Sequence, residues 1–349
     1  MESAHAHRKD EHLAIAESQY RQRLANDAFQ AMRLVHHGLP ELAITDVSLK
    51  THVLDTEWQH PFYIEAMTGG SNKTTAINQQ LAEIAQATNL AMAVGSESIV
   101  LKDPTSQKSF TIVRKSNPHG FIMANLGASH SVENAQRVVD LINANALEIH
   151  INSAQEIVMP EGDRDFHWLK NIEAIVNHLS VPVIVKEVGF GISKKTIQQL
   201  QNIGVKHINV GGRGGTNFAT IEDRRNHAID YAFLADWGQT TLESLIETQI
   251  ANSQKIEVLA TGGINSPLDI LKAQVMGAKA VGIAGHFLHT LLTEKQAGLH
   301  QEILNWQYQL QQLFALVGAK DQHALTTVDY ILSPTLLNYY QQRQTQNFK

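Results

Sequence analysis

The sequence predicts an α/β fold: a (β/α)8 TIM barrel with an N-terminal helical arm and C-terminal helices. Eight short apolar runs alternate with helix-patterned segments between residues 61 and 285. Most of these runs are continuously hydrophobic, which is typical of parallel strands covered on both faces. Eight strand-then-helix units of even length favour a closed barrel over an open doubly wound sheet, the competing architecture.

The expected strands can be read directly in chain order. They are FYIEAM (62–67), LAMAVG (90–95), FIMANLG (121–127), LEIHIN (147–152), PVIVKEVG (182–189), KHINVGG (206–212), IEVLATGG (256–263) and AVGIAG (280–285). Several helix-length segments between them open on Ser or Thr, which cap helix N-termini, and end near Gly or Asn. These segments are 74–89, 131–145, 193–204 and 266–278.

The ends of the chain add to this barrel without forming separate domains. Residues 1–60 are expected to form an arm with a helix over 8–24, and residues 294–349 are expected to be C-terminal helices. The domain organisation that follows is an arm, 1–60, which contributes substrate-binding residues, and a barrel with its C-terminal helices, 61–349.

Composition excludes several classes of protein. The chain has 43% apolar and 18% charged residues and a net charge of -6 without a basic block, which argues against nucleic acid as a partner. It has no cysteine, so disulfides, Cys-ligated zinc and thiol nucleophiles are excluded. No apolar run approaches the roughly 20 residues that span a bilayer, and the N-terminus is too polar for a signal peptide. We therefore expect no membrane partner and a cytoplasmic location.

Glycines follow the last two expected strands. TGGI contains Gly262 and Gly263, and AGH contains Gly285. Glycines allow backbone amides to approach an anion, and loops after the seventh and eighth strands are the usual phosphate site of such barrels. The stretch GGRGGTNF, after the sixth strand, is either a mobile lid or an anion nest, in which Thr216 could bind the same phosphate.

Lys186 ends the fifth expected strand and should point into the barrel mouth. It could act as a Schiff-base nucleophile or as a fixed cation that stabilises negative charge. A lysine at a strand end that only reaches towards solvent is the structural alternative. Thr68, Ser96 and Asn125 follow the first three strands, where they could bind a heterocycle or serve as cap and turn residues.

Two further polar groups are candidates for substrate and metal. Glu156 stands in HINSAQE beside Gln155, after His150 and Asn152, and could coordinate Mg²⁺ together with phosphate oxygens. A loop glutamate is otherwise usually a surface residue. Residues 8, 9 and 12 (Arg, Lys, His) lie within one helical turn and could bind a diphosphate, although they could also form a solvated charged face.

The motifs together resemble the type 2 isopentenyl-diphosphate delta-isomerases, which are FMN-dependent barrel enzymes. The resemblance runs from about residue 8 to beyond residue 330. It is carried by RKDEH, EAMTGG, VGSES, ANLGA, HINSAQE, EGDRDF, VKEVGFGIS, GGRGGTNFATIEDRR, TGGI and GIAG. It implies the interconversion of isopentenyl and dimethylallyl diphosphate by a 1,3-allylic proton shift in isoprenoid biosynthesis. It also implies reduced FMN, NADPH as the reductant, Mg²⁺, and a homotetramer or larger homo-oligomer.

The resemblance assigns roles to individual residues. It implies that Glu156 binds the metal. The catalytic residues would be His150, Asn152, Gln155 and Lys186. The substrate would be bound by Arg8, Lys9, His12, Gln155 and Ser98. FMN would be bound by Ala66, Met67, Thr68, Ser96, Asn125, Lys186, Thr216, Gly262, Gly263, Ala284 and Gly285.

Two places depart from the commoner pattern of that family. Glu97 and Ser98 follow Ser96 where many members have Gln-Arg or Gln-Met, so an arginine contact to the substrate is missing here. Asn265 follows TGGI where many members have Arg, which weakens a cationic contribution near the FMN phosphate.

The main alternative is an FMN-dependent 2-hydroxy-acid oxidase of the same barrel class. It would need a histidine base and arginines for a substrate carboxylate, and it would leave RKDEH without a task. A nucleotide dehydrogenase would need a cysteine nucleophile, which is absent. A Schiff-base aldolase that uses Lys186 should show no flavin spectrum, and a flavin-binding scaffold should not respond to Mg²⁺.

Overall fold

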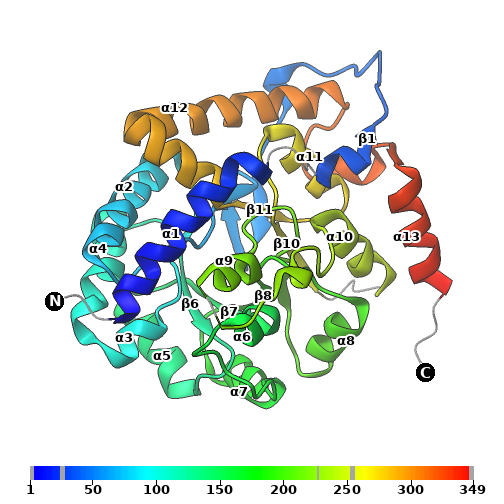
Figure 1. The fold of residues 1–349 in the computed structure, drawn as a ribbon. Helices are drawn as coiled ribbons and strands as arrows, with labels where there is room; N and C mark the ends of the chain where they lie inside the picture. The colour runs from blue at the N-terminus through cyan, green and yellow to red at the C-terminus, as the bar shows by residue number, and fades with distance from the viewer. Residues whose placement is uncertain (1–3, 24–27, 226–227, 252–255, 346–349) are drawn as a thin grey trace.

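The computed structural model describes residues 4–23, 28–225, 228–251 and 256–345 and, within the first helix, the side chains of residues 10–20. Eight strands close into a barrel in the order β10-β11-β4-β5-β6-β7-β8-β9, and every neighbouring pair is parallel (Figure 1). The predicted closed barrel is therefore confirmed. Its strands are β4 (Phe62–Ile64), β5 (Met92–Ala93), β6 (Ile122–Gly127), β7 (Ala146–Ile151), β8 (Val183–Glu187), β9 (His207–Asn209), β10 (Glu257–Thr261) and β11 (Ala280–Ile283).

Helices surround the barrel, and their starting points follow from the sequence. The hydroxyls of Ser71, Ser131, Ser193, Thr240 and Ser266 each accept a hydrogen bond from the backbone N–H three residues on, which caps the helix. The helices between strands are α2 (Asn72–Thr88), α3 (Ser98–Lys102), α4 (Lys108–Ser116), α5 (Val132–Leu141), α6 (Ser153–Val158), α7 (Leu169–His178), α8 (Lys194–Asn202), α9 (Phe218–Arg225), α10 (Thr241–Ile250) and α11 (Pro267–Val275). Short 3-10 turns are η1 (Ala28–Ala31), η2 (Ile44–Asp46), η3 (Pro104–Gln107), η4 (Ala232–Leu234) and η5 (His323–Thr327).

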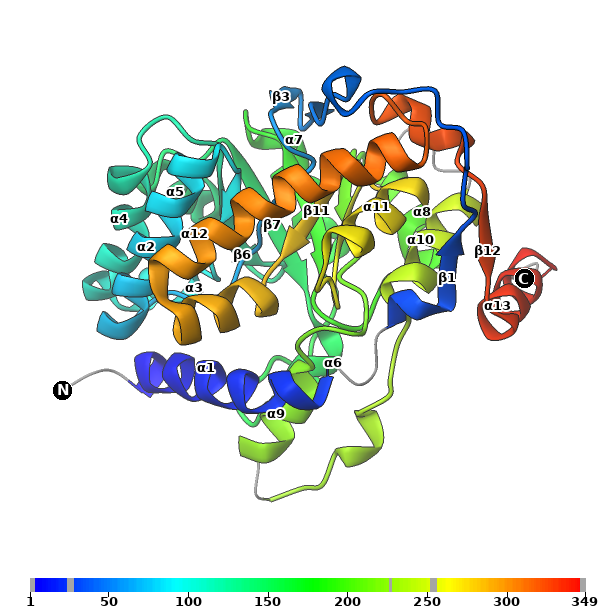
Figure 2. The same ribbon diagram turned by 90° about the horizontal axis from the view of Figure 1, so that it is seen from above.

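Helix α1 (Ala4–Arg23) lies across the carboxyl-terminal mouth of the barrel, beside α9 and α12 (Figures 1 and 2). Contacts along its length hold it there. Ser71 Oγ donates to Asp10 Oδ1 at 2.8 Å, and Glu17 Oε1 lies 2.5 Å from His289 Nδ1. The Tyr20 hydroxyl lies 2.6 Å from Nδ1 of His286. The predicted helix is therefore present, and it covers the end of the barrel where the polar loops converge.

A β-hairpin covers the opposite end of the barrel, and the sequence did not reveal it. Strands β2 (Thr51–Val53) and β3 (Thr56–Trp58) pair antiparallel, and the hairpin packs Val53, Leu54 and Trp58 against the side chains inside the barrel. Its turn places Leu54 and Asp55 at φ 53° and 58°. Such turns usually contain Asn-Gly or Asp-Gly, so Leu-Asp gave no turn signal.

The C-terminal region contains more than helices. Helix α12 (Gly285–Leu316) begins directly after β11 and is interrupted at Lys295, where φ is 66°. Strand β12 (Tyr330–Leu332) pairs antiparallel with β1 (Met32–Leu34), and α13 (Pro334–Thr345) follows. This pairing joins segments some 300 residues apart, which local patterns could not indicate. Within the described ranges, no helix is long and apolar enough to cross a bilayer.

The barrel interior contains polar side chains packed among the apolar ones. Gly282 on β11 makes room for them, because a Cβ there would lie 2.7 Å from Glu65 Oε2 and 2.7 Å from the Tyr63 ring. A side chain at this position would therefore overpack the interior.

Gly282→Ala is expected to lower the free energy of unfolding by about 1 to 3 kcal/mol, the usual cost of overpacking a core. Urea denaturation measures the difference from the native chain. Gly38→Ala is the control, because a Cβ at Gly38 has no neighbour within 4 Å and should leave stability nearly unchanged. Equal stabilities for the two variants would contradict the predicted packing at Gly282.

Candidate active site

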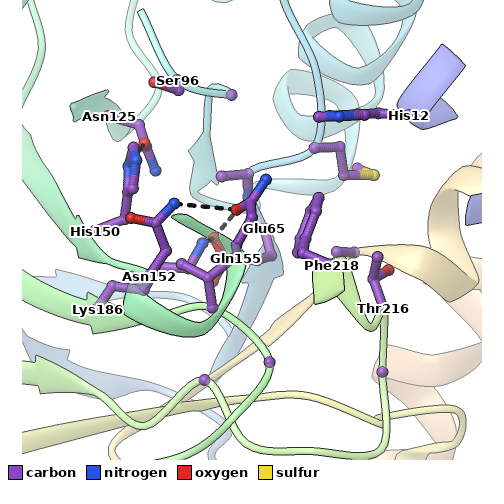
Figure 3. Close-up of a pocket in the computed structure, with 18 of the residues that line it drawn as sticks. His12, Glu65, Ser96, Asn125, His150, Asn152, Gln155, Lys186, Thr216 and Phe218 are labelled. Atoms are coloured by element: carbon purple, nitrogen blue, oxygen red, sulfur yellow. Dashed lines mark hydrogen bonds and ion pairs between the residues drawn. The ribbon is translucent and has the colours of Figure 1, made fainter. Parts of the chain in front are cut away.

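A cavity of about 650 Å³ opens at the carboxyl ends of the barrel strands, beneath α1 and α9. Its size is that of a site for a cofactor or a drug-sized ligand. Helix α1 contributes His12, Leu13, Ala16 and Tyr20 to its wall, and Phe218 of α9 packs edge-on against His12 (Figure 3). The N-terminal helix is therefore part of the site.

Lys186 lies at the bottom of the cavity and is almost fully buried. Its Nζ donates to Glu65 Oε1 at 2.6 Å and lies 3.6 Å from Glu148 Oε2. Burial alone would lower the pKa of the ammonium, but the charges of Glu148 and Glu65 outweigh it and raise the pKa. The raised pKa favours the fixed-cation role of Lys186 over the Schiff-base role.

Asn125 connects this lysine cluster to His150. Its Nδ2 donates to Glu148 Oε2 at 2.9 Å, so its Oδ1 is free to accept from His150 Nδ1, also at 2.9 Å. The register of β6, β7 and β8 places Asn125 opposite Glu148 and His150 opposite Lys186. Strand alternation thus directs Glu148 and His150 to the same face of the barrel.

Gln155 lies on the short helix α6, next to Asn152 in the cavity (Figure 3), and its amide has a hydrogen-bond partner at each end. Its Nε2 donates to Glu222 Oε1 at 3.0 Å, and its Oε1 accepts from Asn152 Nδ2 at 3.1 Å. Asn152 Nδ2 also donates to Glu156 Oε1 at 3.0 Å, and Glu156 Oε2 accepts from the Asp163 amide at 2.7 Å. The amide group of Gln155 therefore has a fixed orientation.

Glu222 on α9 is fully buried behind Gln155 and lies next to His12 and Arg225. Its Oε1 lies 2.9 Å from His12 Nε2, and its Oε2 forms an ion pair with Arg225. Burial would raise the pKa of Glu222, but the hydrogen bond and charge of His12, the hydrogen bond of Gln155 and the charge of Arg225 lower it to about 2. Glu222 is thus a buried carboxylate that contacts two cavity residues, His12 and Gln155.

Glycine loops form the side of the cavity opposite Gln155. A Cβ on Gly215 would lie 3.0 Å from the Gly263 amide nitrogen, and one on Gly262 would lie 2.0 Å from the Gly212 carbonyl oxygen. Gly262 and Gly263 also have φ of 106° and 73°. Only glycine allows these loops to pack backbone against backbone with their amides at the surface of the cavity.

The cavity brings together nearly all the residues that the sequence singled out. Arg8 and Lys9 lie in α1, but their side chains are outside the described part of the chain. The roles of all these residues stay predictions. The candidates that line the cavity are His12, Ala66, Met67, Thr68, Ser96, Ser98, Asn125, His150, Asn152, Gln155, Glu156, Lys186, Thr216, Gly262, Gly263, Ala284 and Gly285.

Three carboxylates of the site were missed from sequence. Glu148 could have been found, since strand alternation places it on one face with His150 and Asn152. Glu65 alternates with Tyr63 in the same way on β4 and its loop, but a glutamate at a strand end is usually solvated. Glu222 lies in IEDRR, where nothing distinguishes it from the charged neighbours on an exposed helix.

The two departures from the family pattern have local structural roles. Glu97 is fully buried, and its Oε2 accepts a hydrogen bond from the backbone N–H of Asn125 at 3.1 Å. Burial raises the pKa of Glu97 well above the usual range. Ser98 Oγ lies 3.0 Å from both Ser96 Oγ and His130 Nε2. The Asn265 side-chain amide donates to the Gly263 carbonyl at 3.0 Å, which supports the glycine loop.

The barrel and its cavity define the class of flavin-binding α/β-barrel enzymes. The model of the family described as FMN-dependent dehydrogenase matches residues 104–331. Solved structures of mandelate oxidase have the same fold: one with (S)-2-phenylpropionate has a TM-score of 0.65 at 18% identity, over 92% of this chain and 98% of that one. Another, with a monooxide FMN adduct, has a TM-score of 0.63 at 18% identity, over 93% and 92%.

Sequence comparison identifies the family within that class. The isopentenyl-diphosphate delta-isomerase of Limosilactobacillus reuteri is 53% identical over 98% of this chain and 99% of its own length. Those of Latilactobacillus sakei and Staphylococcus aureus are 50% and 44% identical, over 98% and 96% of this chain and 97% and 96% of their own lengths. The chain belongs to the isopentenyl-diphosphate delta-isomerase family, as the sequence motifs predicted.

The residues present fit a flavin mononucleotide. The buried Thr68 Oγ1 has no hydrogen-bond partner in the structure and can serve a ring heteroatom. Lys186 and Asn125 offer further polar groups at the bottom of the cavity, and the glycine loops with Thr216 and Gly285 form a cradle for a phosphate. The cavity therefore supplies both ends of the binding site that FMN requires.

Gly285→Ala is expected to weaken FMN binding roughly tenfold or more, because its methyl group would enter the phosphate cradle. Stability should not change, since the nearest atom to that Cβ is Thr216 Oγ1 at 3.8 Å. Quenching of FMN fluorescence measures the affinity, and the thermal midpoint checks the fold. An unchanged FMN affinity would place the phosphate elsewhere.

Proposed function

We propose that the protein interconverts isopentenyl diphosphate and dimethylallyl diphosphate by a 1,3-allylic proton shift, in isoprenoid biosynthesis. The observation that carries the proposal is the 44% to 53% identity of nearly the whole chain to enzymes with that isomerase name. The contents of the cavity support it, because they combine a flavin site with polar groups that can orient an alkene.

Reduced FMN, when bound, supplies the electron-rich ring beside which the proton is moved. Lys186, held by Glu65, stabilises negative charge at the bottom of the cavity. The glycine loops bind the phosphate, and Thr68, Ser96 and Asn125 bind the ring. These roles follow the predicted set of cofactor residues.

Gln155, His150 and Asn152 face the substrate in this proposal. Asn152 and Glu222 fix the amide of Gln155, and Asn125 fixes His150, so the groups around the alkene are oriented before it binds. Glu222 is a weak base while His12 is paired with it. A diphosphate that binds His12 would compete with Glu222 for the same imidazole.

The diphosphate and its metal are assigned to the cavity wall near α1. Arg8, Lys9, His12 and Ser98 would bind the diphosphate, and Glu156 would bind Mg²⁺. Among the described residues, no group of three or more His, Asp or Glu could hold a metal ion. Diphosphate and water oxygens would therefore complete the coordination of a magnesium bound at Glu156.

Several finer features are also proposals that follow the family resemblance. NADPH would reduce the flavin once, without stoichiometric consumption. The assembly would be a homotetramer or larger, and the location would be cytoplasmic.

The 2-hydroxy-acid oxidase alternative is weaker. Such an enzyme would need arginines for a substrate carboxylate, and among the described residues that line the cavity none is an arginine. The likeness to mandelate oxidase, at 18% identity, extends to the fold alone.

Purified protein with FMN, NADPH and Mg²⁺ is expected to convert isopentenyl diphosphate to dimethylallyl diphosphate under anaerobic conditions. NADPH use should be catalytic, because the reaction has no net redox change. Product formation and NADPH absorbance measure the two quantities in one assay. Stoichiometric NADPH oxidation, or turnover of a 2-hydroxy acid instead, would contradict the proposal.

Glu156→Gln is expected to raise the Mg²⁺ concentration for half-maximal activity by roughly tenfold or more, because an amide is a poor ligand for a hard cation. FMN affinity should stay unchanged. Glu161→Gln is the matched control, since Glu161 also lines the cavity but faces Arg225 at 3.5 Å. Loss of FMN from Glu156→Gln, or equal Mg²⁺ dependence in both variants, would show that Glu156 has another role.

A further inference from the structure

Glu65 is a carboxylate whose hydrogen-bonding capacity is filled inside the barrel. Its Oε1 accepts from Lys186 Nζ and from the Ala66 amide, each at 2.6 Å. Its Oε2 accepts from the Tyr63 hydroxyl at 2.8 Å and from Asn209 Nδ2 at 2.9 Å. Four donors, one of them an ammonium, match the acceptor sites of an ionised carboxylate.

Glu148 is the second carboxyl near the same ammonium, and its surroundings are different. Its Oε2 accepts from Asn125 and lies 3.6 Å from Lys186 Nζ, but its Oε1 is buried with no hydrogen-bond partner in the structure. An ionised carboxylate with one oxygen unsatisfied in a fully buried position is costly. This environment favours the neutral acid.

The charges of the cluster lead to the same conclusion. Glu65, Glu148 and Lys186 are all buried, so two ionised carboxylates would leave one negative charge in excess beside a single ammonium. Where two carboxyls share a buried site, the pKa of one of them is strongly raised. One proton therefore belongs to the cluster, and Glu148, which has the fewer donors, carries it.

We propose that Glu65 and Glu148 are positioning residues that fix the place and net charge of Lys186 and so set the reduction potential of the bound flavin. Glu65 holds the ammonium at the bottom of the cavity. While Glu148 is protonated, the cluster is neutral. When Glu148 loses its proton, the cluster gains one negative charge. The inference rests on the proposed flavin site.

The pH at which this change occurs follows from the groups around Glu148. Burial and the charge of Glu65 raise the pKa of Glu148 to about 8, opposed by Lys186 and the hydrogen bond of Asn125. Tyr63 on β4 also faces the cluster. His150 and Glu97 are linked to the cluster through Asn125.

The sign of the effect on the flavin follows from these charges. Below pH 8 the cluster is neutral, and reduction of the flavin leaves Glu148 protonated. Above pH 8 an ionised Glu148 opposes added negative charge on the flavin, so reduction draws a proton onto it. The reduction potential should therefore show an additional fall with pH, beyond the pH dependence of the flavin itself, that begins near pH 8.

Anaerobic redox titration of the FMN-loaded protein from pH 6.5 to 9.5 tests the proposal in the native chain and two variants. Glu148→Gln replaces a neutral acid by a neutral amide. The flavin reduction potential of this variant should match the native value at pH 7 to within about 30 mV, which is a tenfold change in the equilibrium constant of a two-electron couple. Its pH dependence should not include the additional fall above pH 8. Glu65→Gln should shift that fall to lower pH, because Glu148 then becomes the partner of Lys186.

Glu97→Gln is the matched control. Glu97 is also a buried carboxyl with a raised pKa, but it contacts Asn125 instead of Lys186. This variant should keep the additional fall. An additional fall that persists in Glu148→Gln, or is lost equally in Glu97→Gln, would overturn the proposal.

A second measurement needs no flavin and separates this inference from the proposed function. Infrared difference spectra between the FMN-free native protein and Glu148→Gln should contain a protonated carboxylic acid component at pH 7 that titrates near pH 8. Glu97 and Glu187, whose pKa values are also raised by burial, contribute to both spectra and cancel in the difference. Absence of a band that depends on Glu148 overturns the inference even if a variant fails to bind FMN. Failure of the native protein to bind FMN would instead contradict the proposed function.

Discussion

Closure of the parallel sheet is the constraint on which the site depends. In a closed barrel all eight strands end at one mouth, so residues more than 200 positions apart, such as Thr68 and Gly285, line one cavity. Closure also encloses the polar side chains inside the barrel, where they bind one another in place of water. The pairing of Lys186 with Glu65 across the interior is a direct result, because Lys186 on β8 and Glu65 directly after β4 both extend inward.

The low exposure of these groups gives each hydrogen bond more weight than it would have in water. Asn125 shows how far one side chain can connect the site, since it contacts Glu148 and His150 through its amide group and Glu97 through its backbone. The cluster around Lys186 and the His150 side chain are therefore joined through the amide group of Asn125. A change at Asn125 would disturb both, which distinguishes it from the cap and turn residues around it.

The sequence predicted the barrel and most of the cavity wall, because both depend on local patterns. Continuous apolar runs marked the eight strands, and polar residues at the strand ends marked the mouth, where Lys186 and Gln155 indeed lie. The β1–β12 pairing and the β2–β3 hairpin were missed, since their strands have only three residues each. Glu222 was missed because its burial depends on contacts with His12 and Gln155, which come from distant parts of the chain.

The position of α1 has a practical consequence for work with this protein. Helix α1 crosses the mouth of the cavity, whereas α13 lies at the side of the barrel away from the point where α1 begins (Figures 1 and 2). A purification tag or a reporter domain placed before α1 would sit beside the entrance to the cavity. It could pull on α1 and strain the contacts of Asp10 with Ser71 and of Glu17 with His289. Fusion after α13 leaves that entrance clear, so the C-terminal side is the suitable place for immobilisation or labelling.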